Sequence, residues 1–458
     1  MTEIKKYWLP NGVYSFLTNV ILFISGFAGF ILLVRFYNKS EFGAWALYLA
    51  VTSFADVARA GFVTNALVRY ASTQETKSEY SKVLSGSLFL HILFTLILMI
   101  FIYLIAPFVG KIWSSYEFYK LLIYYPIYAF CQIPFLYFSA IEQANLSFRN
   151  QYYSNLIRNS LFIGMIAFIV FSKTHFPVYY LPFLQSVAVI AGGIYLLIAN
   201  RKSIKISKKI DIKWLKKLIN FGKYVFGGNV ISILFTNIDQ ILLGYFFNTR
   251  VVATYNTAMR IGNFSDIPMT SVASIIYPKS GQRFQTVGSK GIRHLYERSV
   301  GLILAFVIPS LVVLIILAEP IVKTIATEAY LDAIPAIYII LLFSLFKPFI
   351  KYFVITAEAL EKPHFNFSLM MNLLLINFIL DLFLIPRFGL IGAAFGSLIS
   401  LVIGMIASLL ILNKLLGVRL TRIIRYTFSF YLEILEFIIF FNEYKESFEE
   451  KIREENGK

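Results

Sequence analysis

Long apolar segments alternate with short polar connections along almost the whole chain. A stretch of about 20 apolar residues is what an α-helix needs to cross the hydrocarbon core of a membrane. Twelve such spans are predicted, near residues 13–35, 43–65, 84–109, 118–140, 155–172, 178–199, 222–247, 253–276, 299–322, 333–357, 366–386 and 390–412. The pattern therefore predicts an all-α integral membrane protein.

Two of these segments repeat each other. Residues 19–38 read NVILFISGFAGFILLVRFYN, and residues 229–248, 210 positions later, read NVISILFTNIDQILLGYFFN. Eight of the twenty positions are identical without a gap, and the register continues from Phe54–Val57 to Phe264–Ile267. A half-length repeat in an apolar chain is typical of secondary transporters built from two like halves, with the substrate between them.

The repeat predicts two six-helix lobes, residues 1–208 and residues 209–419. Because each half holds six spans, both lobes have the same orientation, related by a pseudo-twofold axis along the membrane normal. After them, FSFYLEILEFIIFF is short for a span and is interrupted by Glu433 and Glu436. Residues 420–458 are therefore expected to form an interfacial helix and a charged cytoplasmic tail, with a thirteenth span at 426–441 as the alternative.

Charge sets the orientation. The formal net charge is +17, and lysine and arginine are about three times as frequent in alternate loops as in the others when the N-terminus is taken as cytoplasmic. Such loops face anionic lipid, so nucleic acid is not an expected partner. The most basic connection, residues 200–221, is expected to be a linker helix on the cytoplasmic face of the cell membrane.

Composition agrees with this class. Hydrophobic residues make up 58% of the chain and charged residues 15%, against roughly 25% charged in soluble domains. Cys131 is the single cysteine, which excludes an internal disulfide. No set of His, Cys, Asp and Glu has metal-ligand spacing, and no phosphate-binding loop of the P-loop kind is visible. The sequence therefore predicts a protein without cofactor or metal that is not an enzyme.

Several short motifs occur in a characteristic order. They are Glu41-Phe42-Gly43-Ala44-Trp45 after span one, Gly61 to Arg69-Tyr70 at the close of span two, Asp239 in span seven, then Tyr255–Ile261 with a closing Tyr277-Pro278, and LIPRFGLIGAAFGSLIS at 384–400. Together they resemble the polysaccharide-transporter branch of the multidrug/oligosaccharidyl-lipid/polysaccharide exporter superfamily, above all O-antigen and other repeat-unit flippases. The resemblance covers about residues 10–415.

That resemblance implies a V-shaped two-lobe transporter that flips a polyprenyl-diphosphate-linked oligosaccharide to the outer leaflet by alternating access. Membrane lipids, a polysaccharide polymerase and chain-length proteins are the implied partners. Two alternatives stay open: an ion-coupled multidrug or metabolite antiporter of the same superfamily, and a membrane glycan polymerase or glycosyltransferase. The membrane enzyme is disfavoured because no loop is long enough for an outer catalytic domain.

Charged residues in or near the spans are the candidate site. A charge at mid-membrane costs roughly 2.5–3.5 kcal/mol on insertion scales, so such groups are expected to face a cavity. The candidates for binding the cargo are Arg59, Arg69, Arg260, Lys279, Lys347 and Lys351. The candidates for ion coupling are Asp56, Asp239, Asp266 and Glu358. Except for Arg69, Lys279 and Glu358, they are expected to border one central cavity.

The repeat orders these candidates. Asp266 is the mate of Asp56, and Arg59 follows Asp56 at i+3 on the same helical face; a polar clamp inside each lobe is the alternative to a cavity lining. Asp239 has no acidic mate, and interhelical hydrogen bonding is its alternative role. Lys347, Lys351 and Glu358 share one helical face.

The remaining candidates have simpler alternatives. Glu358 and Lys347 could extend their polar ends to the interface from a helix end. Arg69 and Lys279, also repeat mates, could serve the positive-inside rule alone. His91 is expected to be buried with its hydrogen bonds satisfied, and Glu142 is expected at a solvated helix end.

Overall fold

The computed structural model describes residues 2–74, 76–201, 210–263, 266, 269, 273, 288–360 and 362–433, without the side chains of 2–12, 224 and 363. These residues form helices and turns and no strand. The first helices are α1 (Thr2–Phe36), α2 (Lys39–Arg59), the π-helical turn η1 (Ala60–Thr64), α3 (Asn65–Ala71), α4 (Lys77–Ile112), α5 (Tyr116–Cys131), α6 (Ile133–Ala144), α7 (Phe148–Ser172), the 3₁₀ turn η2 (Val178–Tyr180) and α8 (Leu181–Asn200). The later ones are α9 (Ile212–Phe246), α10 (Thr249–Gly262), α12 (Ser289–Ile316), α13 (Ala318–Ile325), η4 (Glu328–Ala333), α14 (Ile334–Ala359), α15 (Pro363–Leu416) and a helix at 420–433.

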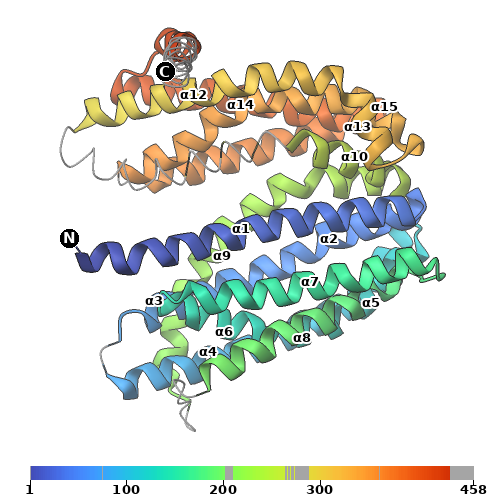
Figure 1. The fold of residues 1–458 in the computed structure, drawn as a ribbon, viewed down its shortest axis with the longest axis vertical. Coiled ribbons are helices and arrows are strands. Elements are labelled where there is room, and N and C mark those ends of the chain that lie inside the picture. The colour runs from blue at the N-terminus through green and yellow to red at the C-terminus, as the bar shows by residue number, and fades with distance from the viewer. Residues whose placement is uncertain are drawn as a thin grey trace, which may run out of the picture. The chain divides into compact units, whose positions relative to one another are not determined.

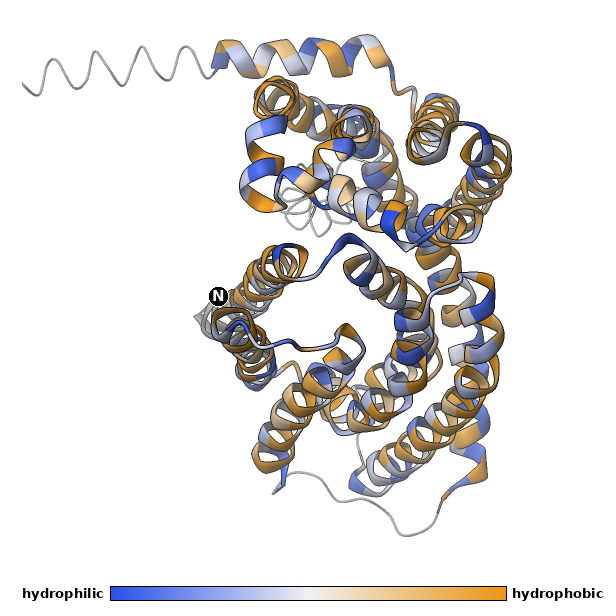
Figure 2. Cartoon of the chain, turned by 90° about the vertical axis from the view of Figure 1, so that its right-hand side faces the viewer, coloured by the Kyte–Doolittle hydropathy of each residue, from blue (hydrophilic) through white to orange (hydrophobic). Residues whose placement is uncertain are grey.

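The helices follow the predicted spans. Nine stretches of the described chain are long and apolar enough to cross a membrane, and counting the bent pair α5–α6 as one span gives ten. The stretch 364–416 contains two predicted spans, while predicted span eight, 253–276, is described only at 253–263, 266, 269 and 273. Figure 2 shows apolar residues along the helices and polar residues gathered at their ends.

Gly389 separates the two spans inside α15. Its φ of 57° and ψ of −130° lie outside the helical region, in a backbone conformation that favours glycine. Pro386, three residues earlier, removes a backbone N–H from the same stretch. The predicted boundary between 386 and 390 is therefore a real break in the helix.

Residues 212–221 of the predicted linker helix form the first turns of α9, which continues to Phe246, so this part is not a separate helix. α9 begins at Ile212, where Asp211 caps it by accepting a hydrogen bond from the Lys213 N–H at 2.9 Å. Trp214 is 7% exposed and packs with Leu67 and Tyr137, whereas Ile212 and Ile219 of the same segment are 68% and 44% exposed. The place of this segment on the cytoplasmic face stays a prediction. Residues 202–209 lie outside the described residues.

The chain divides into two compact units. Unit 1 holds Met1–Thr257, Val322–Asp332 and Ile385–Leu390, and unit 2 holds Ala258–Ile321, Ala333–Leu384 and Ile391–Lys458. In unit 1, α7 packs against both α1 and α8, and α9 packs against α2 (Figure 1). In unit 2, α12 packs against α14. The lobe boundary at 208–209 and the separate segment 420–458 stay predictions.

One motif of the sequence has a clear packing reason in unit 1. Asn38 and Glu41 form a capping box at the start of α2, satisfying backbone N–H groups that the helix leaves unpaired. A Cβ at Gly43 would lie 1.7 Å from the carbonyl oxygen of Thr249 at the start of α10. Glycine therefore lets the backbones of α2 and α10 touch.

Candidate functional site

A buried ion pair lies in unit 1, where α2 meets α5 and α6. The Arg59 guanidinium donates to the Asp56 carboxylate, to the Gln132 side chain and, at 2.8 Å, to the carbonyl oxygen of Ala129. The Tyr125 hydroxyl lies 3.2 Å from the same carboxylate oxygen of Asp56. The Arg59 side chain is 0% exposed and that of Asp56 is 35% exposed. The arginine is thus enclosed, while the carboxylate remains reachable.

His91 lies in α4, deep inside the same unit. It is fully buried, as predicted, and its ring meets the Tyr137 ring edge-on. The expectation of satisfied hydrogen bonds is wrong for the described residues, since neither ring nitrogen has a partner among them.

The repeat mate of Asp56 also binds a cation. The Lys347 ammonium of α14 lies 3.0 and 3.1 Å from the two carboxylate oxygens of Asp266 and 2.8 Å from the amide oxygen of Asn263. The side chains of Lys347 and Asp266 are 21% and 34% exposed. All three residues belong to unit 2. A half-buried ion pair with an accessible lysine therefore connects the segment after α10 to α14.

The two halves make the same connection with different residues. In unit 1 the cation comes from the helix that holds the aspartate and is bound by α5–α6. In unit 2 the cation comes from α14, which contains predicted span ten, the counterpart of span four. In both, a charged group fixes the second helix of a half to its fourth. This geometry agrees with a polar clamp and leaves both aspartates partly exposed.

Asp239 has a local partner in unit 1. Its carboxylate accepts a hydrogen bond from the Tyr255 hydroxyl of α10, and the side chains of Gln240 and Asn256 bond at 2.9 Å beside it. Asp239 is 4% exposed. Interhelical hydrogen bonding between α9 and α10 is therefore present at this position.

Of the remaining candidates, those that the structure describes are half-buried or exposed. Lys351 is half-buried one turn after Lys347, and Glu358 is exposed at the end of α14. Arg260 is exposed near the end of α10. The Arg69 guanidinium lies 4.7 Å from the centre of the Phe221 ring, and Lys279 lies outside the described residues. That these groups border one central cavity stays a prediction.

Glu142 corrects an expectation. It does not lie at a solvated helix end, because it is 3% exposed and its carboxylate accepts hydrogen bonds from Asn150 at 2.9 Å and Asn200 at 2.6 Å. Two asparagines from other helices therefore compensate the buried charge. No group of three or more His, Cys, Asp or Glu in the described part of the chain is placed to hold a metal ion.

Sequence comparison finds relatives along much of the chain. Residues 32–335 match the profile of the family described as polysaccharide biosynthesis protein. An uncharacterized membrane protein of Methanocaldococcus jannaschii is 26% identical over 402 residues, which cover 82% of this chain and 78% of that protein. The probable flippase AglR of Haloferax volcanii is 23% identical over 43% of this chain and 42% of its own length.

A second protein of Haloferax volcanii, the probable low-salt glycan biosynthesis flippase Agl15, is 22% identical over 51% of this chain. That match covers 49% of Agl15, so the matches span less than half the length of either Haloferax flippase.

Solved structures show where the fold occurs. The lipid II flippase MurJ in an inward closed conformation matches 95% of this chain and 93% of its own with a TM-score of 0.73 at 17% identity. An inward-facing multidrug resistance MATE family transporter of the MOP superfamily matches 86% of this chain and 95% of its own with a TM-score of 0.72 at 14% identity. The predicted all-α transporter fold is confirmed by both.

Proposed function

Because the chain belongs to the polysaccharide biosynthesis protein family, we propose that it moves a polyprenyl-diphosphate-linked oligosaccharide across the cell membrane by alternating access. The family match confirms the resemblance predicted from the motifs. The apolar helices make the chain a multi-pass membrane protein. Its place in the cytoplasmic membrane, its cytoplasmic N-terminus and its role in surface polysaccharide biosynthesis are part of the proposal.

The position of Lys347 is the observation that supports this proposal. Lys347 is a cation in an apolar helix, its position is fixed by Asp266 and Asn263, and its side chain keeps part of its surface exposed. A charged hydrogen bond to phosphate contributes about 1.5–3 kcal/mol, which offsets part of the cost of moving a diphosphate out of water. In this proposal the diphosphate competes with Asp266 for Lys347, and Lys351 and Arg260 add further positive charge.

Arg59 has a different role in the same proposal. Its guanidinium is fully enclosed and bound by Asp56, Gln132 and the Ala129 carbonyl, so it acts through Asp56 and does not contact the cargo. Asp56, which is partly exposed, is the group that would bind a coupling ion. Asp266 is its counterpart in the second half.

The antiporter of the same superfamily is the second candidate, because the likeness to the MATE transporter is as close as that to MurJ. Two of the sequence relatives, AglR and Agl15, are named as probable flippases, which favours the first candidate over the second and over a membrane enzyme. A polymerase and chain-length proteins would then act on the product at the outer face.

Complementation tests the proposal. Expression in a host that lacks its own repeat-unit flippase should restore surface glycan, whereas expression in a drug-sensitive host should leave the inhibitory drug concentrations unchanged. Lys351→Ala combined with Arg260→Ala should abolish the restored glycan at equal membrane levels of protein. The reverse result, drug resistance without surface glycan, would establish the antiporter.

A further inference from the structure

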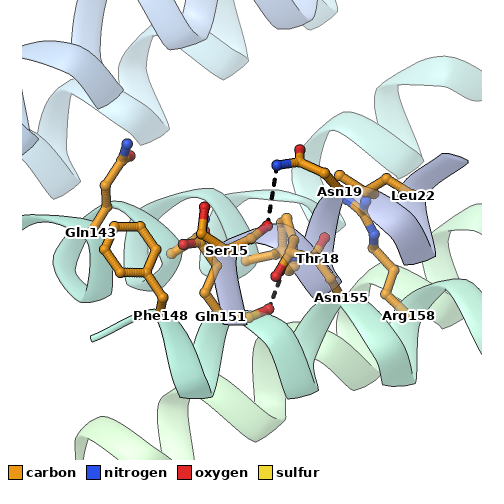
Figure 3. Close-up of a pocket in the computed structure, with 11 residues that line it drawn as sticks. Ser15, Thr18, Asn19, Leu22, Gln143, Phe148, Gln151, Asn155 and Arg158 are labelled. Atoms are coloured by element: carbon orange, nitrogen blue, oxygen red, sulfur yellow. Dashed lines mark hydrogen bonds between the residues drawn. The ribbon is translucent and has the colours of Figure 1, made fainter. Parts of the chain in front are cut away.

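A polar pocket lies in unit 1 between α1, α6 and α7. Its volume is about 290 Å³, near the lower end of about 300–1,000 Å³ for small-molecule sites. Figure 3 shows Gln143 at one end of the lining and Asn19, Leu22 and Arg158 at the other. The described residues that line it are Ser15, Thr18, Asn19, Leu22, Phe135, Ser139, Gln143, Phe148, Gln151, Asn155 and Arg158.

The short turn between α6 and α7 builds this pocket. α6 ends at Ala144 and α7 begins at Phe148, so the chain reverses within three residues, with Leu146 at φ 55°. α7 then packs along α1, where the Tyr14 ring lies 5.7 Å from the Tyr152 ring. Polar residues at i, i+4 and i+7 of α7, Gln151, Asn155 and Arg158, share the face that lines the pocket.

The lining is chemically unusual for a membrane helix bundle. Seven of the eleven lining residues carry a hydroxyl or an amide. Several are already held in place: Asn155, which is 5% exposed, donates to the Gln151 carbonyl at 2.8 Å, and Gln151 donates to the Ser139 hydroxyl at 3.2 Å. Fixed amides and hydroxyls are the groups that bind sugar hydroxyls, because each can both donate and accept.

Arg158 supplies the charge. It is the one ionisable residue among the eleven, and its guanidinium carbon lies 4.5 Å from the centre of the Phe135 ring, which also lines the pocket. None of the salt bridges among the described residues includes Arg158, although the Asp56 carboxylate is near enough to attract it electrostatically. Glu142, the nearest acid in sequence to the lining, is bound by two asparagines. The positive charge is therefore oriented by an aromatic ring and has no carboxylate bound to it.

From this arrangement we infer that the pocket is a binding site for a glycosyl phosphate: Arg158 binds the phosphate, the amides and hydroxyls bind the sugar, and Phe135 and Phe148 lie against it. The inference rests on the proposed function for its biological source, the head of the lipid-linked glycan. In the predicted topology, Ser15–Leu22 and the turn before Phe148 lie near the cytoplasmic leaflet. The pocket would therefore capture the cargo before it crosses.

The same chemistry could come from an ordinary phospholipid headgroup, so the test uses soluble probes of both kinds. Purified full-length protein in nanodiscs is titrated with N-acetylglucosamine 1-phosphate, glycerol 1-phosphate, inorganic phosphate and methyl N-acetylglucosaminide by isothermal calorimetry. We expect the sugar phosphate to bind more tightly than the other three. Arg158→Gln should weaken it about tenfold or more, the value of one charged hydrogen bond.

Matched variants separate binding from folding. Arg149→Gln removes an exposed arginine of the same helix, whose contact is the Tyr153 ring and not the pocket, and should leave the affinity unchanged. Arg158→Lys keeps the charge and should retain more of the binding than Arg158→Gln. Asn155→Ala should weaken the sugar phosphate more than inorganic phosphate. Gel filtration confirms that each variant is folded.

Three results would overturn the inference. They are equal binding of glycerol 1-phosphate, which would assign the pocket to phospholipid headgroups; binding that Arg158→Gln leaves unchanged; and no binding of the sugar phosphate to the wild-type protein. Because the readout is equilibrium binding, a protein that binds the probe but restores no surface glycan would contradict the proposed function and not the pocket. A protein that restores surface glycan without binding the probe would contradict the pocket and not the proposed function.

Discussion

The Lys347 ammonium and the Asp266 carboxylate form an ion pair at 3.0 Å. The 210-residue offset of the repeat aligns Asp266 with Asp56 of the first half. Asp56 binds Arg59 of its own helix. The two aspartates are thus paired with cations from different places: Asp56 with a cation of its own helix, and Asp266 with a cation of α14. In the proposed function a partly exposed carboxylate is needed at this position in both halves, which accounts for an acid that is repeated although its partner is not.

Removing only one partner of the Lys347–Asp266 pair should lower the stability of the protein. Lys347→Met leaves the Asp266 carboxylate without its ammonium partner, and breaking a buried pair in this way costs about 3–5 kcal/mol, less here because both side chains are partly exposed. We expect a lower melting temperature in detergent. The double variant Lys347→Met with Asp266→Asn should recover part of the loss; a double variant less stable than either single one would show that the two residues do not interact.

Arg59 should be more critical for folding than any exposed arginine of unit 1. Arg59→Gln removes the donors to Asp56 and to the Ala129 carbonyl, and we expect a loss of about 3–5 kcal/mol because the whole side chain is buried. Arg69→Gln, at an exposed position, is the control and should stay within about 0.5 kcal/mol of wild type. Thermal unfolding followed by gel filtration measures both, and equal stability of the two variants would contradict the enclosed arginine.

Gly43 should tolerate no side chain. Gly43→Ala places a methyl group 1.7 Å from the Thr249 carbonyl oxygen, so α2 and α10 must separate, and we expect overpacking to cost about 1–3 kcal/mol. Gly228→Ala in α9 is the matched control, because a Cβ there meets no heavy atom within 4 Å. It should be neutral or slightly stabilising, since alanine is the better helix former. Similar melting temperatures for the two variants would refute the close contact.

The predicted topology can be checked with single cysteines in a Cys131→Ala background. Ser207→Cys, between α8 and α9, should resist an impermeant thiol reagent added to intact cells and react after the membrane is opened. Thr174→Cys, exposed between α7 and α8, should react in intact cells and serves as the positive control. Labelling of Ser207→Cys from outside would reverse the orientation derived from lysine and arginine.

The structural equivalence of Asp56 and Asp266 stays a prediction of the repeat. Periodicity and the repeat predicted the helices and the break near Gly389. They did not predict that Asp266 binds Lys347, because the two residues are 81 positions apart and helix spacing says nothing about partners on distant helices. Trp214 of the basic segment 200–221 packs with Leu67 and Tyr137 of other helices, which the pattern within the segment does not predict. The expectation for Glu142 failed for the same reason: its partners, Asn150 and Asn200, come from other helices.

The central claim is that cationic residues of the spans move an anionic lipid-linked glycan. It is tested most directly by reconstituting the purified protein into liposomes that contain a fluorescent polyprenyl-diphosphate disaccharide. A membrane-impermeant quencher is added outside, and the measurement is how fast the lipid of the inner leaflet moves to the outer leaflet and is quenched. The account predicts rapid exchange by the wild type. It predicts loss of that exchange in the folded variant that combines Lys351→Ala with Arg260→Ala, and retention in Arg149→Gln. Wild-type liposomes that exchange no more than empty liposomes, or a double variant that exchanges as fast as wild type, would contradict it.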